Sequence, residues 1–379
     1  MKKGLWGGIA VVVAIVIVLA IISVTQRQGK NIIRVGAVLE LTGNISAYGK
    51  AAMNGIKLAE RELNRANYFG ERELEVVFED SGSSASKAVS AIERMISVEK
   101  VHIVIGGIGS TTTMAMAPVA EKNRVVLLSP GASNPKLSEA GDFIFRNYPS
   151  DLLEAKVMAQ YLRRKGIQKV ATIYANNDFA EGLASTLKMD FTQLGGEVIF
   201  EEGYLPESTD FRTIVAKVTT LNADALYLPG YYQSVGILLR QLKEAGVRLP
   251  KYACTGIEDP LFFSVARDAG DGVIYPTPSI DFQSPPDSAR RFIKEYKELF
   301  GEEPNYPALL AYDAMKIVAL AIRDGGYSPE GIRDALYRIK DFPGITGKTS
   351  FDSRGDAIKP FRFKVADKGQ FRMLDLPGN

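Results

Sequence analysis

The chain has 379 residues, of which 46% are hydrophobic, and a formal net charge of +2. A chain of this length can bury a large core, and at roughly 100 to 200 residues per domain it predicts two domains. Its lysines and arginines are dispersed and almost balanced by acids, which excludes the basic surface of a nucleic-acid-binding protein.

One histidine and one cysteine limit the chemistry of the chain. Cys254 has no second cysteine for an intrachain disulfide or a zinc site. His102 lies inside the apolar run 101–105, which predicts a buried strand and a structural rather than catalytic histidine. Most general-base, Ser/His/Asp and His-metal arrangements need an imidazole in a pocket. We therefore expect a protein that is not an enzyme and uses no metal or cofactor.

The N-terminus carries a segment suited to a membrane. Lys2 and Lys3 precede the uncharged run 5–24, which has about the length needed to cross a bilayer core as an apolar helix. Residues 20–23 fit a signal-peptide cleavage site poorly, which favours a signal anchor over a cleaved signal peptide. The folded part is then expected at the periplasmic or extracellular face of the cytoplasmic membrane. A cleaved, secreted form and a cytoplasm-facing anchored protein are the alternatives.

From residue 31 onward, short β-branched runs alternate with amphipathic stretches of helical length. This alternation is typical of a parallel sheet covered by helices on both faces. The first set of strands is predicted at 32–39, 74–79, 102–106 and 125–128, with helices at 48–65, 85–98 and 111–122. After a connection over 143–150 the second set is predicted at 169–174, 197–204, 225–228 and 252–254, with helices at 151–165, 179–194, 211–221 and 234–245. The pattern predicts two doubly wound α/β lobes in succession.

The last hundred residues depart from this alternation. Segment 276–286 is rich in proline and serine, and the three helical stretches after it have no matching strands. They are expected to pack back on an existing lobe, so the chain should cross between lobes near 147–151, 276–282 and 341–349, forming a hinge. The predicted division is a signal anchor or signal peptide with spacer over 1–30, one lobe of 31–148 plus 281–342, and a second lobe of 149–280 plus 343–379. Helices are expected at 287–300, 307–323 and 329–339, and strands around 361–365 and 371–373.

Two polar turns follow neighbouring strands of the first lobe, where ligands of open α/β sheets bind. In the turn 106–113, glycines let the backbone approach a ligand, and Ser110 or Thr111 can cap the next helix, whose dipole favours an anion. The second turn spans 129–135. Each turn alone could be a plain helix cap. The partial dinucleotide fingerprint in the first turn lacks its third glycine, which is replaced by Thr112.

Aromatic and acidic residues lie at corresponding strand ends elsewhere in the chain. Tyr48, Phe179 and Tyr231 can close over the apolar body of a ligand. The acids that could meet a cationic group are Asp151, Glu258 and Asp259. Any one of these acids alone could be an ordinary solvated surface charge.

These segments, taken in order, carry a resemblance to a known family. They are 35–37 with 42–43 and 48–49, the turn 105–112, the turn 129–135, 145–146, 178–182, 230–231, and 351–352 with 355–356. In this order and spacing they resemble the leucine/isoleucine/valine-binding protein family of type I periplasmic binding proteins, which serve amino-acid ABC importers. The likeness covers nearly everything after residue 31 and implies the fold of that family, with two lobes joined by a three-segment hinge.

The resemblance also implies roles for individual residues. Ser110, Gly131, Ala132 and Ser133 would bind the α-carboxylate of a ligand, and Ser133 with the Gly131 carbonyl would also face its ammonium. Tyr48, Phe179 and Tyr231 would match the aromatics that enclose the ligand side chain, and Asp151 matches a position near the hinge. The family's glutamate for the ammonium falls on Gly256 here, with Glu258 and Asp259 two and three residues further on.

The expected function is therefore capture of a small carboxylate-bearing solute by hinge closure and its delivery to an ABC permease in the membrane. An amino acid of branched-chain type is the first expectation. If no acid reaches the cleft, an ammonium would be buried with neutral acceptors only, which is costly, and an aromatic or aliphatic acid without an amine becomes the alternative. A ligand-sensing ectodomain acting through a membrane partner is a further alternative.

Overall fold

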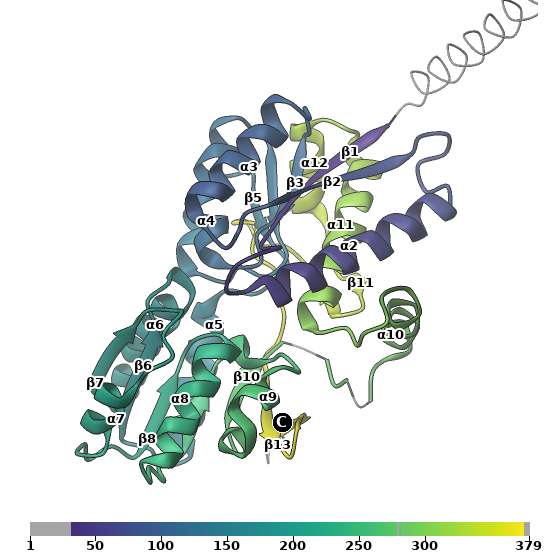
Figure 1. Ribbon diagram of the computed structural model, residues 1–379. Helices are drawn as coiled ribbons and strands as arrows, with labels where there is room; N and C mark the ends of the chain where they lie inside the picture. Colours follow the sequence, from purple (N-terminus) through teal and green to yellow (C-terminus); the bar gives the residue numbers. More distant parts are fainter. Residues whose placement is uncertain (1–31, 279, 283, 375–379) are drawn as a thin grey trace, which may run out of the picture.

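The computed structural model describes residues 32–278, 280–282 and 284–374. Two α/β units lie end to end, and the chain passes between them more than once (Figure 1). Within these described ranges no helix combines the length and apolar character needed to cross a membrane. The anchor expected over 5–24 lies outside the described residues.

The first unit is built on a five-stranded sheet in the order β2-β1-β3-β4-β5, with every neighbouring pair parallel. The strands are β1 (Ile33–Leu39), β2 (Leu74–Asp80), β3 (Ile103–Gly106), β4 (Val126–Ser129) and β5 (Ile144–Arg146). β3 and β4 are buried along their whole length because helices cover both faces of a parallel sheet. β5 falls in the stretch 143–150 that was expected only to connect the lobes, since a strand of three residues leaves little periodic signal.

Six helices and a short 3-10 turn surround this sheet. They are α2 (Ser46–Arg65), α3 (Ala85–Ser97), α4 (Ser110–Lys122), η1 (Pro135–Glu139), α10 (Asp287–Phe300), α11 (Tyr306–Gly325) and α12 (Pro329–Arg338). The long helix α11 packs along α2, and α12 packs against α11 (Figure 1). Thirteen of the 20 residues of α11 are buried, so the late helices extend the core of the first unit rather than building a third one.

The second unit is a seven-stranded mixed sheet in the order β14-β13-β10-β9-β8-β6-β7. Its strands are β6 (Lys169–Ala175), β7 (Glu197–Tyr204), β8 (Ala225–Leu228), β9 (Lys251–Ala253), β10 (Ile274–Thr277), β13 (Arg362–Asp367) and β14 (Gln370–Met373). Only the pairs β10–β13 and β13–β14 are antiparallel. Its helical elements are α5 (Asp151–Arg164), α6 (Asp178–Gln193), α7 (Arg212–Val218), α8 (Tyr232–Glu244), η2 (Thr255–Ile257), α9 (Phe262–Ala266) and η3 (Arg267–Gly270).

The strand β10 was missed because its last two residues lie in the segment that was expected to break the pattern. Pro276 is part of the strand and is paired with Phe363 of β13. Tyr275 before it and Thr277 after it are both buried, so the pairing is supported by burial even though proline donates no backbone hydrogen bond.

The third passage between the units lies further along the chain than the expected 341–349. A hairpin of β11 (Phe342–Gly344) and β12 (Gly347–Thr349) is held to α11, because the Asp313 carboxylate accepts the backbone N–H groups of Ile345 and Thr346. Residues 351–357 then lie beside β5, where Asp356 bridges to Arg146. The chain reaches the second unit only with β13, so the segment 343–357 belongs to the first unit.

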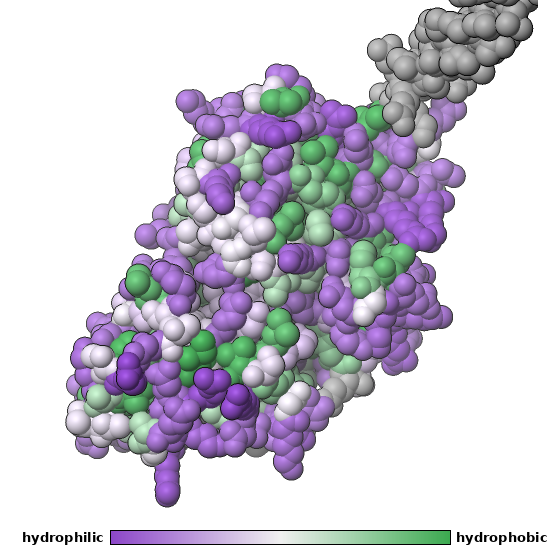
Figure 2. Space-filling model, in the orientation of Figure 1, coloured by the Kyte–Doolittle hydropathy of each residue, from purple (hydrophilic) through white to green (hydrophobic). Residues whose placement is uncertain are grey.

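The surface of the face in view is mostly polar. Figure 2 shows hydrophilic side chains over both units, with hydrophobic side chains exposed in separate patches. Within the described residues, the buried apolar side chains form the hydrophobic cores of the two units.

Candidate functional site

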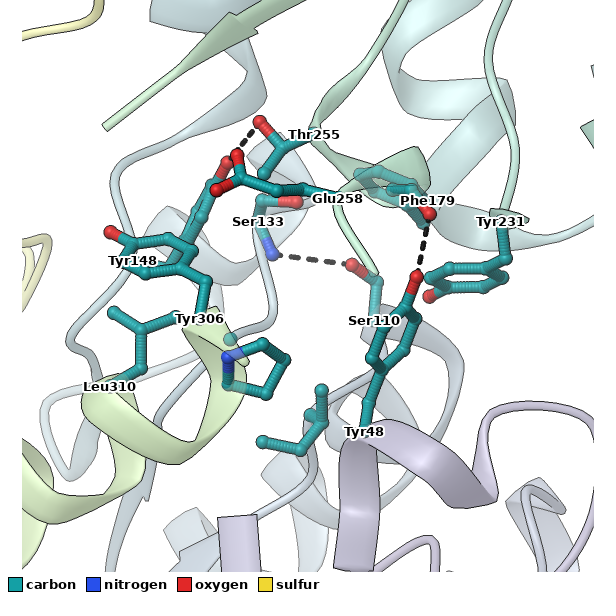
Figure 3. Close-up of a pocket in the computed structure, with 14 residues that line it drawn as sticks. Tyr48, Ser110, Ser133, Tyr148, Phe179, Tyr231, Thr255, Glu258, Tyr306 and Leu310 are labelled. Atoms are coloured by element: carbon teal, nitrogen blue, oxygen red, sulfur yellow. Dashed lines mark hydrogen bonds between the residues drawn. The ribbon is translucent and has the colours of Figure 1, made fainter. Parts of the chain in front are cut away.

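A pocket lies between the two units, at the carboxyl ends of their parallel strands. Its cavity volume is about 60 Å³, which is room for a few water-sized groups. Figure 3 shows Ser110 and Ser133 between one group of Tyr148, Tyr306 and Leu310 and another of Tyr48, Phe179 and Tyr231. The full lining is Tyr48, Ile108, Ser110, Gly131, Ser133, Tyr148, Phe179, Tyr231, Thr255, Gly256, Glu258, Tyr306, Pro307 and Leu310.

Aromatic side chains from both units close one side of this pocket. Tyr48 of α2 lies 5.8 Å from the Tyr231 ring, and Phe179 of α6 stacks on Tyr231 at 5.2 Å between centroids. The Tyr48 hydroxyl also donates to the Gly256 carbonyl at 2.8 Å, from the first unit to the second. The two units are therefore in a closed arrangement, with a wall that disappears if they separate.

Serine side chains join the two polar turns at the floor of the pocket. Ser110 begins α4, and its hydroxyl accepts the backbone N–H groups of Ser133 and Asn134 at 3.3 and 3.2 Å. The Ser129 hydroxyl accepts the N–H of Ala132 at 2.9 Å, so this N–H is bonded within the turn and is not available to a ligand. Ser110, Gly131 and Ser133 face the pocket, whereas Ala132 is buried outside its lining.

The glycine-rich turn before α4 already holds an anion that belongs to the chain. The buried carboxylate of Glu40 accepts the N–H groups of Ile108 and Gly109, each at 3.0 Å, and the hydroxyl of Thr112. Burial raises the pKa of Glu40, and these hydrogen bonds oppose that rise. The anion site expected at this helix N-terminus is thus occupied by Glu40, which sequence analysis missed because it follows β1 as a single acid with no motif around it.

The acid expected to meet an ammonium is already compensated. Glu258 borders the pocket, but its carboxylate lies 2.6 Å from the ammonium of Lys364 on β13, and both side chains are buried. Lys364 also donates to the Ile280 carbonyl at 2.8 Å. Asp259 points elsewhere, because its carboxylate accepts the Leu261 N–H and the side-chain amide of Asn305, the N-cap of α11.

Gly256 leaves no room for the side chain that the resemblance would place there. A Cβ atom at this position would lie 2.3 Å from the Gly230 carbonyl oxygen and 2.9 Å from the Phe179 ring. Contacts this short to backbone cannot be relieved by a rotamer change. A glutamate at position 256 is therefore incompatible with this closed pocket.

Two further acids lie together beneath the pocket at the start of α5. Asp151 has none of its surface exposed, and its backbone N–H donates to the Ser133 carbonyl at 2.9 Å. Burial raises its pKa to about 7, against the opposing effects of the Ser133 hydroxyl and Arg146. Glu154 accepts the Thr255 N–H at 2.9 Å and the Tyr148 hydroxyl at 3.2 Å. Burial, followed by the charge of Asp151, raises the pKa of Glu154 to about 8.

The expected site residues separate into two groups. Those that line the pocket are Tyr48, Ser110, Gly131, Ser133, Phe179, Tyr231 and Glu258, and those that lie outside its lining are Ala132, Asp151 and Asp259. The lining residues not foreseen are Ile108, Tyr148, Thr255, Gly256, Tyr306, Pro307 and Leu310. The last three lie in the first two turns of α11, and no local pattern indicates which face of the lobe that helix would meet. Whether any of these side chains touches a ligand stays a prediction.

The sole histidine and cysteine lie outside the lining of the pocket. The His102 ring packs against Tyr327 at 4.7 Å between centroids, just before β3 rather than inside it. Cys254 is buried at the end of β9, and burial raises the pKa of its thiol. Within the described part of the chain, no group of three or more His, Cys, Asp or Glu side chains could hold a metal ion.

Comparisons with known proteins agree on one family. Residues 32–370 match a family described as periplasmic binding protein. The chain is 26% identical over 344 residues to the leucine-, isoleucine-, valine-, threonine- and alanine-binding protein of Pseudomonas aeruginosa, covering 90% of this chain and 91% of that protein.

Solved structures agree with this match. The leucine binding protein LivK of Thermotoga maritima is similar with a TM-score of 0.85 and 28% identity, over 90% of this chain and 98% of that one. The branched-chain amino acid transporter substrate binding protein LivJ of Streptococcus pneumoniae, in complex with isoleucine, is similar with a TM-score of 0.83 and 29% identity, over the same shares of the two chains. The fold expected from the resemblance is confirmed.

Proposed function

The chain belongs to the periplasmic binding protein family and is a substrate-binding protein of the ABC-transporter type rather than an enzyme, and on that premise we propose that it captures an amino acid of branched-chain type. The single observation that carries this proposal is the composition of the closed pocket, which combines a floor of serine side chains with aromatic and aliphatic walls. A branched-chain amino acid has one charged end and one apolar end, and each would find a matching side of this pocket.

The proposed binding mode follows from those two sides. The ligand carboxylate would lie at Ser110 and Ser133, within reach of their hydroxyls. The aliphatic side chain would lie against Tyr48, Phe179 and Tyr231, where each buried methylene contributes about 0.8 kcal/mol. The walls would therefore contact mainly the apolar part of the ligand. This agrees with the names of relatives that bind leucine, isoleucine and valine.

Closure of the two units would couple capture to delivery. The bond from Tyr48 to the Gly256 carbonyl and the contact between Tyr48 and Tyr231 join the units across the pocket. A ligand that touches both sides binds the closed form better than the open form and so shifts the equilibrium toward closure. An ABC permease would recognise the closed form, and residues 5–24 would hold the protein at the outer face of the cytoplasmic membrane.

A second candidate ligand is favoured by one specific observation. Glu258 is paired with Lys364, so its negative charge is already balanced and is not available to a ligand ammonium. A carboxylic acid without an amine, aromatic or aliphatic, would not need such a partner and would avoid burying an unpaired ammonium.

The test is calorimetric titration of the full-length chain, purified in detergent, with matched ligands. Leucine, isoleucine and valine are compared with 4-methylpentanoate, which is leucine without its amine, and with benzoate. We expect saturable binding of at least one of the three amino acids at equimolar stoichiometry. Binding of 4-methylpentanoate or benzoate with no binding of the three amino acids would replace the first proposal by the second.

A further inference from the structure

Two buried cations near the pocket are each paired with a carboxylate. Arg146 is held by Asp356, with the closest nitrogen and oxygen 2.6 Å apart, and Lys364 is held by Glu258 at the same distance. Each pair brings one cation and one anion into the protein interior together. Neither pair therefore adds net charge to the walls of the pocket.

Asp151 belongs to no such pair. Its side chain is completely buried, and neither carboxylate oxygen has a hydrogen-bond partner of good geometry among the residues that the structure describes. No lysine or arginine in the described ranges lies within salt-bridge distance of it, since the guanidinium of Arg146 is bonded to Asp356 and to the carbonyls of Ser133 and Asn134. An ionised carboxylate in this setting is costly unless a cation arrives.

The position of Asp151 relates it directly to the pocket. Its backbone N–H donates to the carbonyl of Ser133, the residue that forms part of the pocket floor. Its charge acts on two other residues of the lining, since it contributes to the raised pKa values of Tyr148 and Tyr231. Asp151 therefore lies one side chain behind the floor, with the Ser133 hydroxyl nearest to it on the pocket side.

We propose that Asp151 supplies the negative charge that compensates the ammonium of a bound amino acid, acting across the hydroxyl of Ser133, and that Glu258 does not. This inference rests on the proposed function and specifies how the site would recognise an amine. Asp151 is a positioning residue here, because the ammonium would contact Ser133 and would interact with Asp151 electrostatically, without direct contact. Two observations agree with the assignment: Glu258 already has a cation, and position 256 cannot carry an acid.

The neighbouring acid reinforces this arrangement. Burial raises the pKa of both acids, and the two titrate as a pair that gains its first negative charge near neutral pH. A ligand ammonium above Ser133 would stabilise that charge, and the carboxylate would stabilise the ammonium in return. Binding of the amine and ionisation of Asp151 are then mutually favourable.

The test compares leucine with 4-methylpentanoate in three forms of the full-length chain. Calorimetry is performed at pH 7.5 on the wild type, on D151N, and on the control E258Q/K364Q, which removes both members of the other pair without leaving a charge behind. Asparagine keeps the shape of Asp151 and removes only its charge. Thermal unfolding of each variant reports whether it is folded.

We expect D151N to weaken leucine binding by roughly 10- to 100-fold, the range for a hydrogen bond to a charged group, and to leave 4-methylpentanoate binding unchanged or tighter. The variant E258Q/K364Q should weaken leucine binding by less than D151N does, because it removes a pair that has no net charge. Equal leucine affinity in D151N and wild type, or equal losses for both ligands, would overturn the inference. A larger loss of leucine binding in the control than in D151N would assign the ammonium to Glu258 instead. Wild-type binding of 4-methylpentanoate without any amino acid would overturn the proposed function, and this assignment with it.

Discussion

Two buried carboxylates near the same pocket have opposite surroundings. Glu258, in the turn after β9, borders the pocket and is bonded to Lys364 from β13. Asp151, at the start of α5, lies behind the pocket floor and has no such cation. On the proposed assignment, the acid that responds to the ligand is the one without a cation, not the one that borders the pocket. The partner of a buried charge decides whether it is part of the scaffold or free to respond.

The strongest test of this contrast is to remove the cation from the balanced pair. K364M leaves the Glu258 carboxylate buried without its ammonium, and breaking a buried pair in this way costs about 3 to 5 kcal/mol. We expect the free energy of unfolding in urea at pH 7.5 to fall by that amount. The matched control is K243M, which removes an exposed lysine paired with Asp268 and should change stability by about 0 to 1 kcal/mol. Equal effects of the two substitutions would contradict the balanced role of Lys364.

Removing the charge of Asp151, the acid without a cation, should raise the free energy of unfolding instead of lowering it. The pKa of Asp151 is raised from 3.8 to about 7, so the folded chain binds its proton more tightly than the unfolded chain, and stability is lost as pH rises from about 4 to 7. At about 1.4 kcal/mol per unit, ligand-free D151N at pH 8 should be more stable than wild type by up to about 4 kcal/mol, less the cost of burying an amide.

This gain should shrink to less than about 1 kcal/mol near pH 4, where Asp151 is protonated in the folded chain and only partly ionised in the unfolded chain. Urea unfolding of wild type and D151N at pH 4 and pH 8 measures the difference. A D151N variant that is less stable than wild type at pH 8 would mean that the carboxylate has a stabilising partner after all.

Leucine binding should respond to pH through the same group. Lowering the pH below about 7 protonates Asp151 in the ligand-free chain, so leucine affinity should fall by roughly up to tenfold per pH unit between pH 7 and pH 5.5, and D151N should lack this slope. The groups that act on Asp151 or feel its charge are Arg146, Tyr148, Glu154, Tyr227, Tyr231 and Cys254. Among these, Glu154 also has a pKa raised into the neutral range, and it titrates together with Asp151. A slope of equal size in D151N would assign the response to another group.

The smallest predicted effect concerns closure. Y48F removes the hydroxyl that donates to Gly256 and keeps the ring that packs on Tyr231. Loss of one neutral hydrogen bond corresponds to about 0.5 to 1.5 kcal/mol, so leucine affinity should fall by roughly 2- to 12-fold, with 4-methylpentanoate affected equally. Unequal effects on the two ligands would place Tyr48 in recognition of the amine rather than in closure.

The sequence predicted the lobes well because their signals are local. Alternating β-branched runs and amphipathic helices mark β1 to β4 and β6 to β9 almost to the residue. Short elements such as β5 and α9 carry too few residues for a period to be visible. The late third passage also escaped prediction, because Asp313 and the Arg146–Asp356 pair hold 343–357 to the first unit through contacts between distant residues.

The candidate site was predictable only in part for the same reason. Tyr48, Ser110, Ser133 and Phe179 follow strands or begin helices, and such positions can be found from local pattern. The pairing of Glu258 with Lys364 joins residues 106 apart in the sequence, and the beginning of α11 reaches the pocket through tertiary packing. The spacing of residues along one sequence does not indicate contacts between residues this far apart.

The most direct measurement of the central claim is a crystal structure of the leucine complex. We predict one leucine between the two units, with its ammonium bonded to the Ser133 hydroxyl on the Asp151 side of the pocket and with the Glu258–Lys364 pair intact. An ammonium bonded to Glu258, with Lys364 displaced from that carboxylate, would contradict the account.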